Sequence, residues 1–192
     1  MSLFYKLSIL MGLIVVVSNY LVQFPIQFLG LNEILTYGAF SYPITFLITD
    51  LANRAYGSIV ARKIVYIGFF VGVILTLLVS TNFSDLISVR IAIGSGAAFF
   101  IAQNIDIKIF DFLRKKTWYI APLTSSVLGS IIDTFLFFSI SFYATGVSWV
   151  SLAVGDLFVK LLIALAMLIP FRLLLSSIKE ISSGNLSKIR WI

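Results

Sequence analysis

Long apolar runs separated by short polar stretches cover most of this chain. A helix that crosses a bilayer needs about 20 mostly apolar residues. The runs predict six membrane segments, which span residues 7–23, 39–53, 64–80, 86–112, 118–144 and 149–175. The second segment is short and contains Pro43, so it is either a broken segment that lines a cavity or an ordinary helix that begins near the proline.

The amino-acid composition is that of a protein surrounded by lipid. Hydrophobic residues make up 60% of the 192 residues and charged residues 11%, whereas soluble domains carry roughly 25% charged residues. The mean hydropathy is +1.07. We therefore expect an all-α, polytopic membrane protein, in which residues 1–192 form a single six-helix transmembrane transporter domain.

Basic residues alternate between the two sides of the predicted bundle. They precede the first segment and follow the second, fourth and sixth, at Lys6, Arg54, Arg62, Lys63, Arg114, Lys115, Lys116, Arg172, Lys179, Lys188 and Arg190. Because basic loops mark the cytoplasmic side, we expect both termini in the cytoplasm. The net charge of +6 is thus interpreted as an orientation signal and not as a surface for nucleic acid.

The chain contains neither Cys nor His. Thiol nucleophiles, disulfides, cysteine zinc sites and imidazole bases are therefore excluded. The chain also has no glycine-rich phosphate-binding loop of the P-loop ATPases. We expect no enzymatic activity, no cofactor and no resident metal.

Several ionisable side chains fall inside the predicted segments. A charge in the bilayer costs at least about 2.5–3.5 kcal/mol on insertion scales, so each is a candidate functional residue. Asp156 and Lys160 are four residues apart and can form an ion pair, which also fits a purely structural role. Asp133 has no cation near it in its own segment. The other candidates are Asp50, Asp106, the uncharged Gln103 and Arg90, whose side chain could instead extend to the outer interface.

Helical spacing places some of these groups on shared faces. Gln103 and Asp106 lie three residues apart. Small residues allow close contact between membrane helices, so we expect the faces that carry them to point into the bundle. Such residues are Gly94, Gly96, Ala97 and Ala98 in the fourth segment and the stripe Ser126, Gly129, Ser130 and Asp133 in the fifth. The Phe and Tyr rings are interpreted mainly as lipid contacts or interfacial belts.

Two kinds of ligand suit this set of groups. A carboxylate accepts two parallel hydrogen bonds from an N–H and a neighbouring amino group, which is the edge that guanine-like rings present. An amide or a cation can donate to the ring carbonyl, and an aromatic side chain can stack on the ring. A hard metal ion held by several carboxylates is the other option, and composition alone does not choose between them.

Several stretches resemble one family of membrane transporters, in order and along nearly the whole chain. The resemblance rests on Ser18–Gln23, Gly38–Pro43, Thr49–Leu51 with Arg54 and Gly57, Arg90–Ala92, Gln103 with Asp106 and Phe110, Asp133–Thr134, and the pair Asp156 and Lys160. The family is that of the queuosine precursor transporters, also called the vitamin uptake transporter (VUT) family. The resemblance implies a multi-pass importer in the bacterial inner membrane. Its cargo would be a 7-deazaguanine nucleobase, such as 7-cyano-7-deazaguanine, 7-aminomethyl-7-deazaguanine or queuine, salvaged for queuosine in tRNA.

The resemblance and the residue chemistry together suggest which side chains meet the substrate. We expect Asp133 or Asp50 to accept from the N–H and amino edge, with Gln103 as an amide partner. Arg54 is expected near the cytoplasmic mouth, paired with Asp50. The full set of expected substrate-binding residues is Asn19, Asp50, Arg54, Arg90, Gln103, Asp106, Asp133, Asp156 and Lys160.

Other functions compete with that of a stand-alone carrier. The chain could be the substrate-binding membrane subunit of an ATP-driven vitamin uptake complex. A membrane enzyme is disfavoured by the lack of His and Cys, and a purely structural subunit is disfavoured by the cost of the buried charges. The preferred precursor, the coupling to a proton gradient and the formation of a homo-oligomer are left open.

Overall fold

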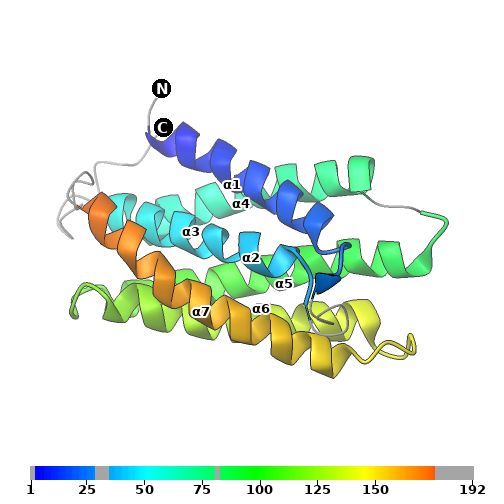
Figure 1. Cartoon of the computed structure of the whole chain (residues 1–192). Coiled ribbons are helices and arrows are strands. Elements are labelled where there is room, and N and C mark those ends of the chain that lie inside the picture. The colour runs from blue at the N-terminus through cyan, green and yellow to red at the C-terminus, as the bar shows by residue number, and fades with distance from the viewer. Residues whose placement is uncertain (1–2, 29–34, 81–82, 176–192) are drawn as a thin grey trace.

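The computed structural model describes residues 3–28, 35–80 and 83–175. Within these residues the regular structure is helical, apart from an isolated β-bridge between Pro25 and Thr36. In chain order the helices are α1 (Leu3–Leu21), α2 (Gly38–Ser41), α3 (Pro43–Tyr56), α4 (Ser58–Leu75), the π-helical turn η2 (Thr76–Ser80), α5 (Leu86–Leu113), α6 (Ile120–Phe142) and α7 (Trp149–Leu175). Figure 1 shows the long helices running side by side, with α2 and α3 in the middle of the bundle. The predicted all-α membrane fold is confirmed.

Five of the described helices are long and apolar enough to cross a membrane. They lie within α1, α4 with the start of η2, α5, α6 and α7. These helices correspond to five of the six predicted segments. Their outer surfaces carry many exposed large apolar side chains, as expected where lipid replaces water as the solvent.

The remaining predicted segment is divided between α2 and α3. Pro43 occupies the first position of α3, where a missing N–H costs little because no intrahelical acceptor is available. Tyr42 keeps helical backbone angles between the two helices and donates its N–H to the Gly38 carbonyl at 3.1 Å. With 14 residues, α3 is about 21 Å long and thus shorter than a typical hydrocarbon core of about 30 Å. The segment is therefore short and divided, and α3 begins at the proline.

Two helices begin earlier than the apolar runs predict. The first residue of α1 is Leu3 instead of residue 7, and that of α4 is Ser58 instead of residue 64. The early turns of α4 contain Arg62 and Lys63, which the hydropathy pattern assigned to a loop. Both side chains have exposed surface, so their charged ends can reach water while the backbone stays helical. Gly57, with φ of 82°, separates α4 from α3 in a conformation that favours glycine.

Small residues bring neighbouring helices into close contact. On α4, a Cβ atom at Gly68 would overlap the side chain of Met11 on α1. On α5, a Cβ atom at Gly94 would overlap Ser141 on α6. The contact between α5 and α6 is the most extensive in the described structure. The expected close packing of the fourth predicted segment is thus confirmed at Gly94.

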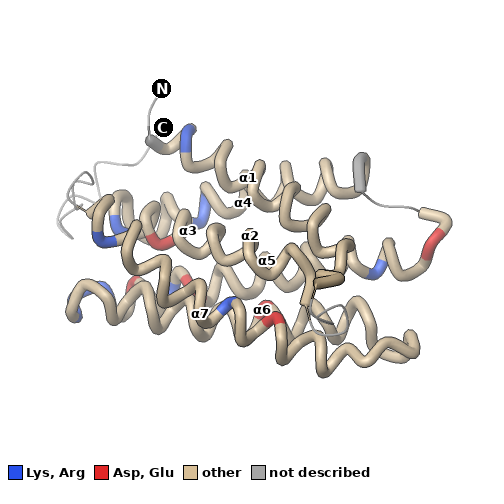
Figure 2. The backbone as a smooth tube through the Cα atoms, viewed as in Figure 1, with Lys and Arg blue, Asp and Glu red and all other residues tan. Residues whose placement is uncertain are grey.

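The charged side chains are distributed unevenly along the bundle. Figure 2 shows that most Lys and Arg positions lie toward the end of the bundle that holds the start of α1 and the turn between α5 and α6. This arrangement agrees with the alternation seen in the sequence, and the cytoplasmic position of that end stays a prediction. The basic residues Lys179, Lys188 and Arg190 lie outside the described residues.

Candidate substrate-binding site

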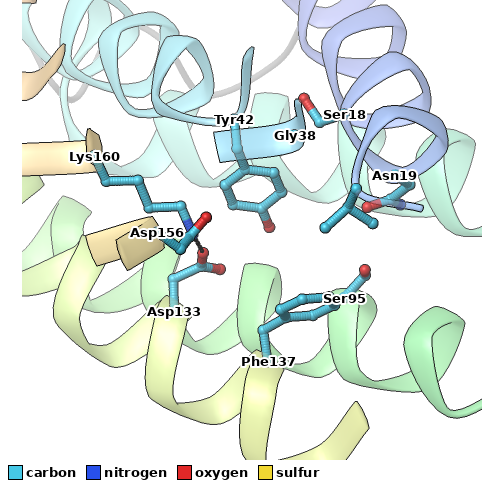
Figure 3. A pocket seen from close by; sticks show the side chains of 10 residues that line it. Ser18, Asn19, Gly38, Tyr42, Ser95, Asp133, Phe137, Asp156 and Lys160 are labelled. Carbon is cyan, nitrogen blue, oxygen red and sulfur yellow. Dashed lines mark hydrogen bonds and ion pairs between the residues drawn. The ribbon is translucent and has the colours of Figure 1, made fainter. Parts of the chain in front are cut away.

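A polar cavity lies where α1, α2, α5, α6 and α7 converge. Figure 3 shows charged groups of α6 and α7 on one side, polar groups of α1 and α5 on the other, and the Tyr42 ring between them. The lining residues are Ser18, Asn19, Val22, Gly38, Tyr42, Ser95, Asp133, Phe137, Asp156 and Lys160. Four of the nine expected substrate-binding residues meet here, namely Asn19, Asp133, Asp156 and Lys160.

Lys160 connects α7 to α6 at this cavity. Its Nζ lies 2.6 Å from Asp156 Oδ2 and 2.9 Å from Asp133 Oδ2, and it donates to Thr134 Oγ1 at 3.1 Å. These three contacts use all three ammonium hydrogens. The ion pair predicted from the spacing of Asp156 and Lys160 is confirmed. Asp133 has no cation in its own segment, but helix packing brings Lys160 from α7 to its carboxylate.

The cluster contains one more carboxylate than ammonium. Asp156 Oδ2 also accepts from Thr134 Oγ1 at 2.9 Å. By contrast, Asp133 Oδ1 and the Tyr42 hydroxyl are buried and have no hydrogen-bond partner of normal geometry, although the two residues are neighbours. The two groups face each other as donor and acceptor. Because buried polar groups are usually hydrogen-bonded, a polar ligand that enters between them would find an acceptor on one side and a hydroxyl on the other.

The Tyr42 ring also contacts the cation. Its centroid lies 5.1 Å from Lys160 Nζ, which is within the range of cation–π attraction. Tyr42 stands at the junction of α2 and α3, so the break in this segment aims an aromatic ring into the cavity. The ring is buried and not lipid-facing.

The cavity is narrow in this conformation. Its volume of about 20 Å³ has room for a water molecule but not for a larger ligand. At its edge, a Cβ atom on Gly38 would come within 2.9 Å of Val22, in the turn that follows α1. Binding of a larger ligand therefore requires that the lining side chains or the helices that carry them move apart.

Two polar contacts attach α1 to the wall of the cavity. Asn19 Nδ2 donates to Thr76 Oγ1 at 2.8 Å, and the hydroxyls of Ser18 and Ser41 are 2.8 Å apart. Thr76 begins the π-helical turn η2, and Ser41 ends α2. Irregular helical turns of this kind are frequent at functional sites, and here they hold the wall that carries Asn19.

Gln103 belongs to a separate polar network between α5 and α3. Its Oε1 accepts from Thr49 Oγ1, and its Nε2 donates to Thr45 Oγ1 at 2.9 Å. All three side chains are fully buried. Both ends of the amide are thus bound by α3, and Gln103 is not among the residues that line the cavity of Figure 3.

Asp50 and Asp106 form a second polar cluster. Asp50 on α3 accepts from Ser125 Oγ and Ser126 Oγ of α6, each at 3.2 Å. It also lines a second cavity, between α3, α6 and α7, together with Ser126 and Ser130. Asp106 on α5 is the buried neighbour of Asp50, and neither of its carboxyl oxygens has a hydrogen-bond partner of normal geometry.

The two arginines among the expected residues lie outside both cavities. Arg54 Nη1 donates to the main-chain oxygen of Arg114 at 2.9 Å, where α5 ends. Arg90 Nε donates to the main-chain oxygen of Ile140 at 3.0 Å, near the start of α5 and the end of α6. The pairing of Arg54 with Asp50 stays a prediction.

Sequence reasoning missed Tyr42, Thr134 and Ser95 as members of the site. Tyr42 directly precedes Pro43 inside one of the stretches that carry the family resemblance, and this position was the available signal. Its ring was instead grouped with the lipid-facing aromatics. Ser95 gives no signal, because a lone serine in an apolar run is common in membrane helices.

Comparison with known proteins supports a transport role for this fold. Residues 36–175 match the family described as "Putative vitamin uptake transporter". The chain is 36% identical to a "Probable queuosine precursor transporter" of Haemophilus influenzae, with 82% of this chain and 79% of that protein aligned. It is 32% identical to the "Queuosine precursor transporter" of Escherichia coli, over 86% and 83% of the two chains. A "Probable queuosine precursor transporter" of Bacillus subtilis is 27% identical, over 85% and 83%.

No solved structure matches the chain. The family assignment therefore rests on sequence, and the match covers the helices from α2 to α7. These are the helices that supply the Lys160 cluster, the Tyr42 ring and the second polar cluster. The resemblance carried by the sequence motifs is confirmed, and the chain belongs to the vitamin uptake transporter family.

Proposed function

We propose that this protein imports queuosine precursors, which are 7-deazaguanine nucleobases, across the bacterial inner membrane, and that it binds them in the cavity of Figure 3. The names of three relatives support the class of cargo. One observation carries the choice of site. Asp133 Oδ1 and the Tyr42 hydroxyl face each other in a buried cavity, and neither forms a hydrogen bond of normal geometry with any other described group.

Hydrogen bonding at this cavity suits the edge of a guanine-like ring. Asp133 Oδ1 accepts from one donor of the N–H and amino edge, while Oδ2 stays on Lys160, which orients the carboxylate. The Tyr42 hydroxyl donates to the ring carbonyl, and Phe137 offers an apolar surface to the ring. A site built to pair a substrate N–H discriminates strongly against analogues without it, because its buried groups are then left unpaired.

The charge of the cluster adds a preference among the precursors. The carboxylates of Asp133 and Asp156 share the single ammonium of Lys160, so the cluster carries one surplus carboxylate. A buried surplus carboxylate is costly without a compensating charge or donor. A precursor with an aminomethyl group, which is cationic at neutral pH, should therefore bind more tightly than one with a nitrile at the same position.

Transport requires that the site opens to each side in turn. The cavity of Figure 3 is formed by the end of α1 and the first half of α7, and the second cavity lies along the second half of α7. On the predicted orientation the first lies toward the outside and the second toward the cytoplasm. Rocking of the helices around Asp133 would expose the substrate through one cavity and then through the other.

Complementation in cells tests this function. The host lacks both queuosine precursor synthesis and its own importer, and each precursor is supplied singly at nanomolar concentration. We expect the wild-type chain to restore queuosine in tRNA. The variant Asp133→Asn should restore little at equal membrane abundance. The matched control is Asp111→Asn, which alters a partly exposed aspartate paired with Arg114, and it should behave as wild type.

Two results would count against the proposal, each against a different part. A well-inserted wild-type chain that restores queuosine with no precursor would refute the class of cargo. Wild-type restoration by Asp133→Asn would leave the cargo in place and refute the site.

A further inference from the structure

The second polar cluster has a feature that substrate binding does not explain. Asp50 and Asp106 are neighbouring carboxyl groups on α3 and α5, and both are at least 98% buried, with exposures of 2% and 0%. The oxygens of Asp50 accept from serine hydroxyls of α6. Asp106 is near the Ser125 hydroxyl and the Asp50 carboxyl group, but neither of its oxygens has a hydrogen bond of normal geometry. An ionised carboxylate without well-formed hydrogen bonds in a membrane interior is among the costliest groups to bury.

A proton resolves this arrangement with the groups that are present. Two adjacent carboxyls that share one proton carry a single negative charge, and the protonated member donates to the other. The hydroxyls of Ser125 and Ser126 then stabilise the remaining charge on Asp50. The same pairing is impossible if both groups are ionised.

None of the ion pairs recorded for the described residues involves Asp106. Arg54, one turn beyond Asp50 on α3, directs its Nη1 to the Arg114 carbonyl. Its single positive charge could neutralise one of the two carboxylates but not both. Lys160 is held in the other cluster by Asp133 and Asp156. The remaining charged or titratable groups on these helices have exposed surface or lie beside the cavity of Figure 3. They are Tyr5, Lys6, Tyr20, Tyr42, Tyr56, Arg62, Lys63, Tyr66, Arg90, Lys108, Asp111, Arg114 and Arg172.

We propose that Asp50 and Asp106 bind a proton between them and release it once in each transport cycle, so that import is coupled to the proton gradient. The proton arrives on the carboxyl pair from one side and leaves to water on the other. The coupling half of this proposal rests on the proposed function, because it needs a transported substrate. The proton-binding half does not.

A path toward the substrate cavity supports the coupling. Ser126 contacts Asp50, and Ser130, one turn further along α6, is buried with a hydroxyl that has no hydrogen-bond partner. Asp133 follows three residues later on the same helix. The polar stripe of α6 therefore links the carboxyl pair to the substrate cavity, and the second cavity gives Asp50 an approach from the opposite half of the bundle.

The first arm of the test needs no substrate. Infrared spectra of the purified full-length chain are recorded in water and in deuterium oxide, and the carbonyl absorption of a protonated carboxyl group is sought. We expect this band in the wild type and its loss in Asp106→Asn. The control Asp111→Asn, on the same helix, should keep it. A wild-type spectrum that matches the Asp106→Asn spectrum overturns the proton site.

The second arm measures transport by the same chain in liposomes. A labelled 7-deazaguanine is supplied under an inward proton gradient, an inward sodium gradient or no gradient, with the membrane potential clamped. At one proton per substrate, a tenfold proton gradient should give about tenfold accumulation at steady state. In Asp106→Asn we expect exchange of label for unlabelled substrate to continue, while accumulation falls to the equilibrium level.

Each alternative result has a definite meaning. Accumulation driven by sodium, or proton-driven accumulation that survives in Asp106→Asn, overturns the coupling. If the infrared band of a protonated carboxyl group is present but uptake stops at equilibrium, the coupling is also overturned. The proton on the Asp50–Asp106 pair then has only a structural role. If the wild type takes up no precursor at all, the proposed function fails, and the infrared difference still decides whether the pair holds a proton.

Discussion

Lys160 on α7 and Asp133 on α6 are 27 residues apart in the chain, yet Lys160 Nζ lies 2.9 Å from Asp133 Oδ2. The contact spans two helices that both line the cavity of Figure 3. Lys160 therefore fixes the orientation of the carboxylate and the spacing of α6 and α7 together. A ligand that binds Asp133 would act directly on this connection, which gives binding a route to helix movement.

Removal of the cation should strongly destabilise the protein. Lys160→Met leaves the carboxylates of Asp133 and Asp156 buried without compensation, and breaking a buried ion pair in this way costs about 3–5 kcal/mol. Denaturant titration of the purified protein in detergent micelles measures the loss. Lys108→Met, which removes an exposed lysine on α5, should change the stability little. A similar, small loss in both variants would show that the cluster does not hold α6 and α7 together.

Gly129 should tolerate no larger side chain. A Cβ atom at this position on α6 would overlap the Phe46 ring of α3, and overpacking of this kind typically costs about 1–3 kcal/mol. At Gly96 on α5 the added atom would meet only ordinary contacts, at 3.4 Å from Val73 and 3.6 Å from Phe69. Gly129→Ala should therefore lower the thermal stability and Gly96→Ala should not. Equal effects would contradict the close packing of α3 on α6.

Gln103 should affect stability more than substrate affinity. Gln103→Met removes the hydrogen bonds to Thr45 and Thr49. Both hydroxyls keep a main-chain carbonyl within hydrogen-bonding distance, that of Tyr42 for Thr45 and that of Thr45 for Thr49. The cost should thus be near the average for hydrogen bonds between membrane helices, about 0.6 kcal/mol and at most about 1.7 kcal/mol. Uptake kinetics should show an unchanged KM. A large rise in KM with normal stability would show that Gln103 contacts the substrate.

The lack of cysteine in the chain makes its orientation easy to test. Lys115→Cys places a single thiol in the turn between α5 and α6, and Ser148→Cys places one between α6 and α7, both at exposed positions. In intact cells, a membrane-impermeant thiol reagent should label Ser148→Cys and spare Lys115→Cys. Labelling of both should require permeabilised cells. The reverse pattern would show that the basic end of the bundle faces outward.

The apolar runs were sufficient to predict most of the helices. The segments 86–112 and 149–175 differ by at most one residue from α5 and α7, because a long and mostly apolar segment satisfies its backbone groups in lipid by forming a helix. The start of α4 was placed too late, since hydropathy counts the charged ends of Arg62 and Lys63 and not their long apolar stems. The break at Pro43 was visible because proline limits the backbone locally.

The site was predictable only where its members are neighbours in one helix. The spacing of Asp156 and Lys160 determines their contact, whereas the contact of Lys160 with Asp133 depends on which faces of α6 and α7 meet. The same limitation applies to Asp50, whose serine partners on α6 are 75 and 76 residues away. Gln103 was assigned to the substrate because its threonine partners on α3 could not be foreseen.

Uptake by the purified chain alone tests the central claim most directly. Wild-type protein and Asp133→Asn are reconstituted into liposomes without any other protein, and entry of a labelled 7-deazaguanine is followed. We predict saturable uptake by the wild type, competition by unlabelled precursors, and loss of uptake in Asp133→Asn at equal insertion. No uptake by the correctly inserted wild type, with uptake restored when an ATPase complex is added, would contradict a stand-alone carrier and identify the chain as a substrate-binding subunit.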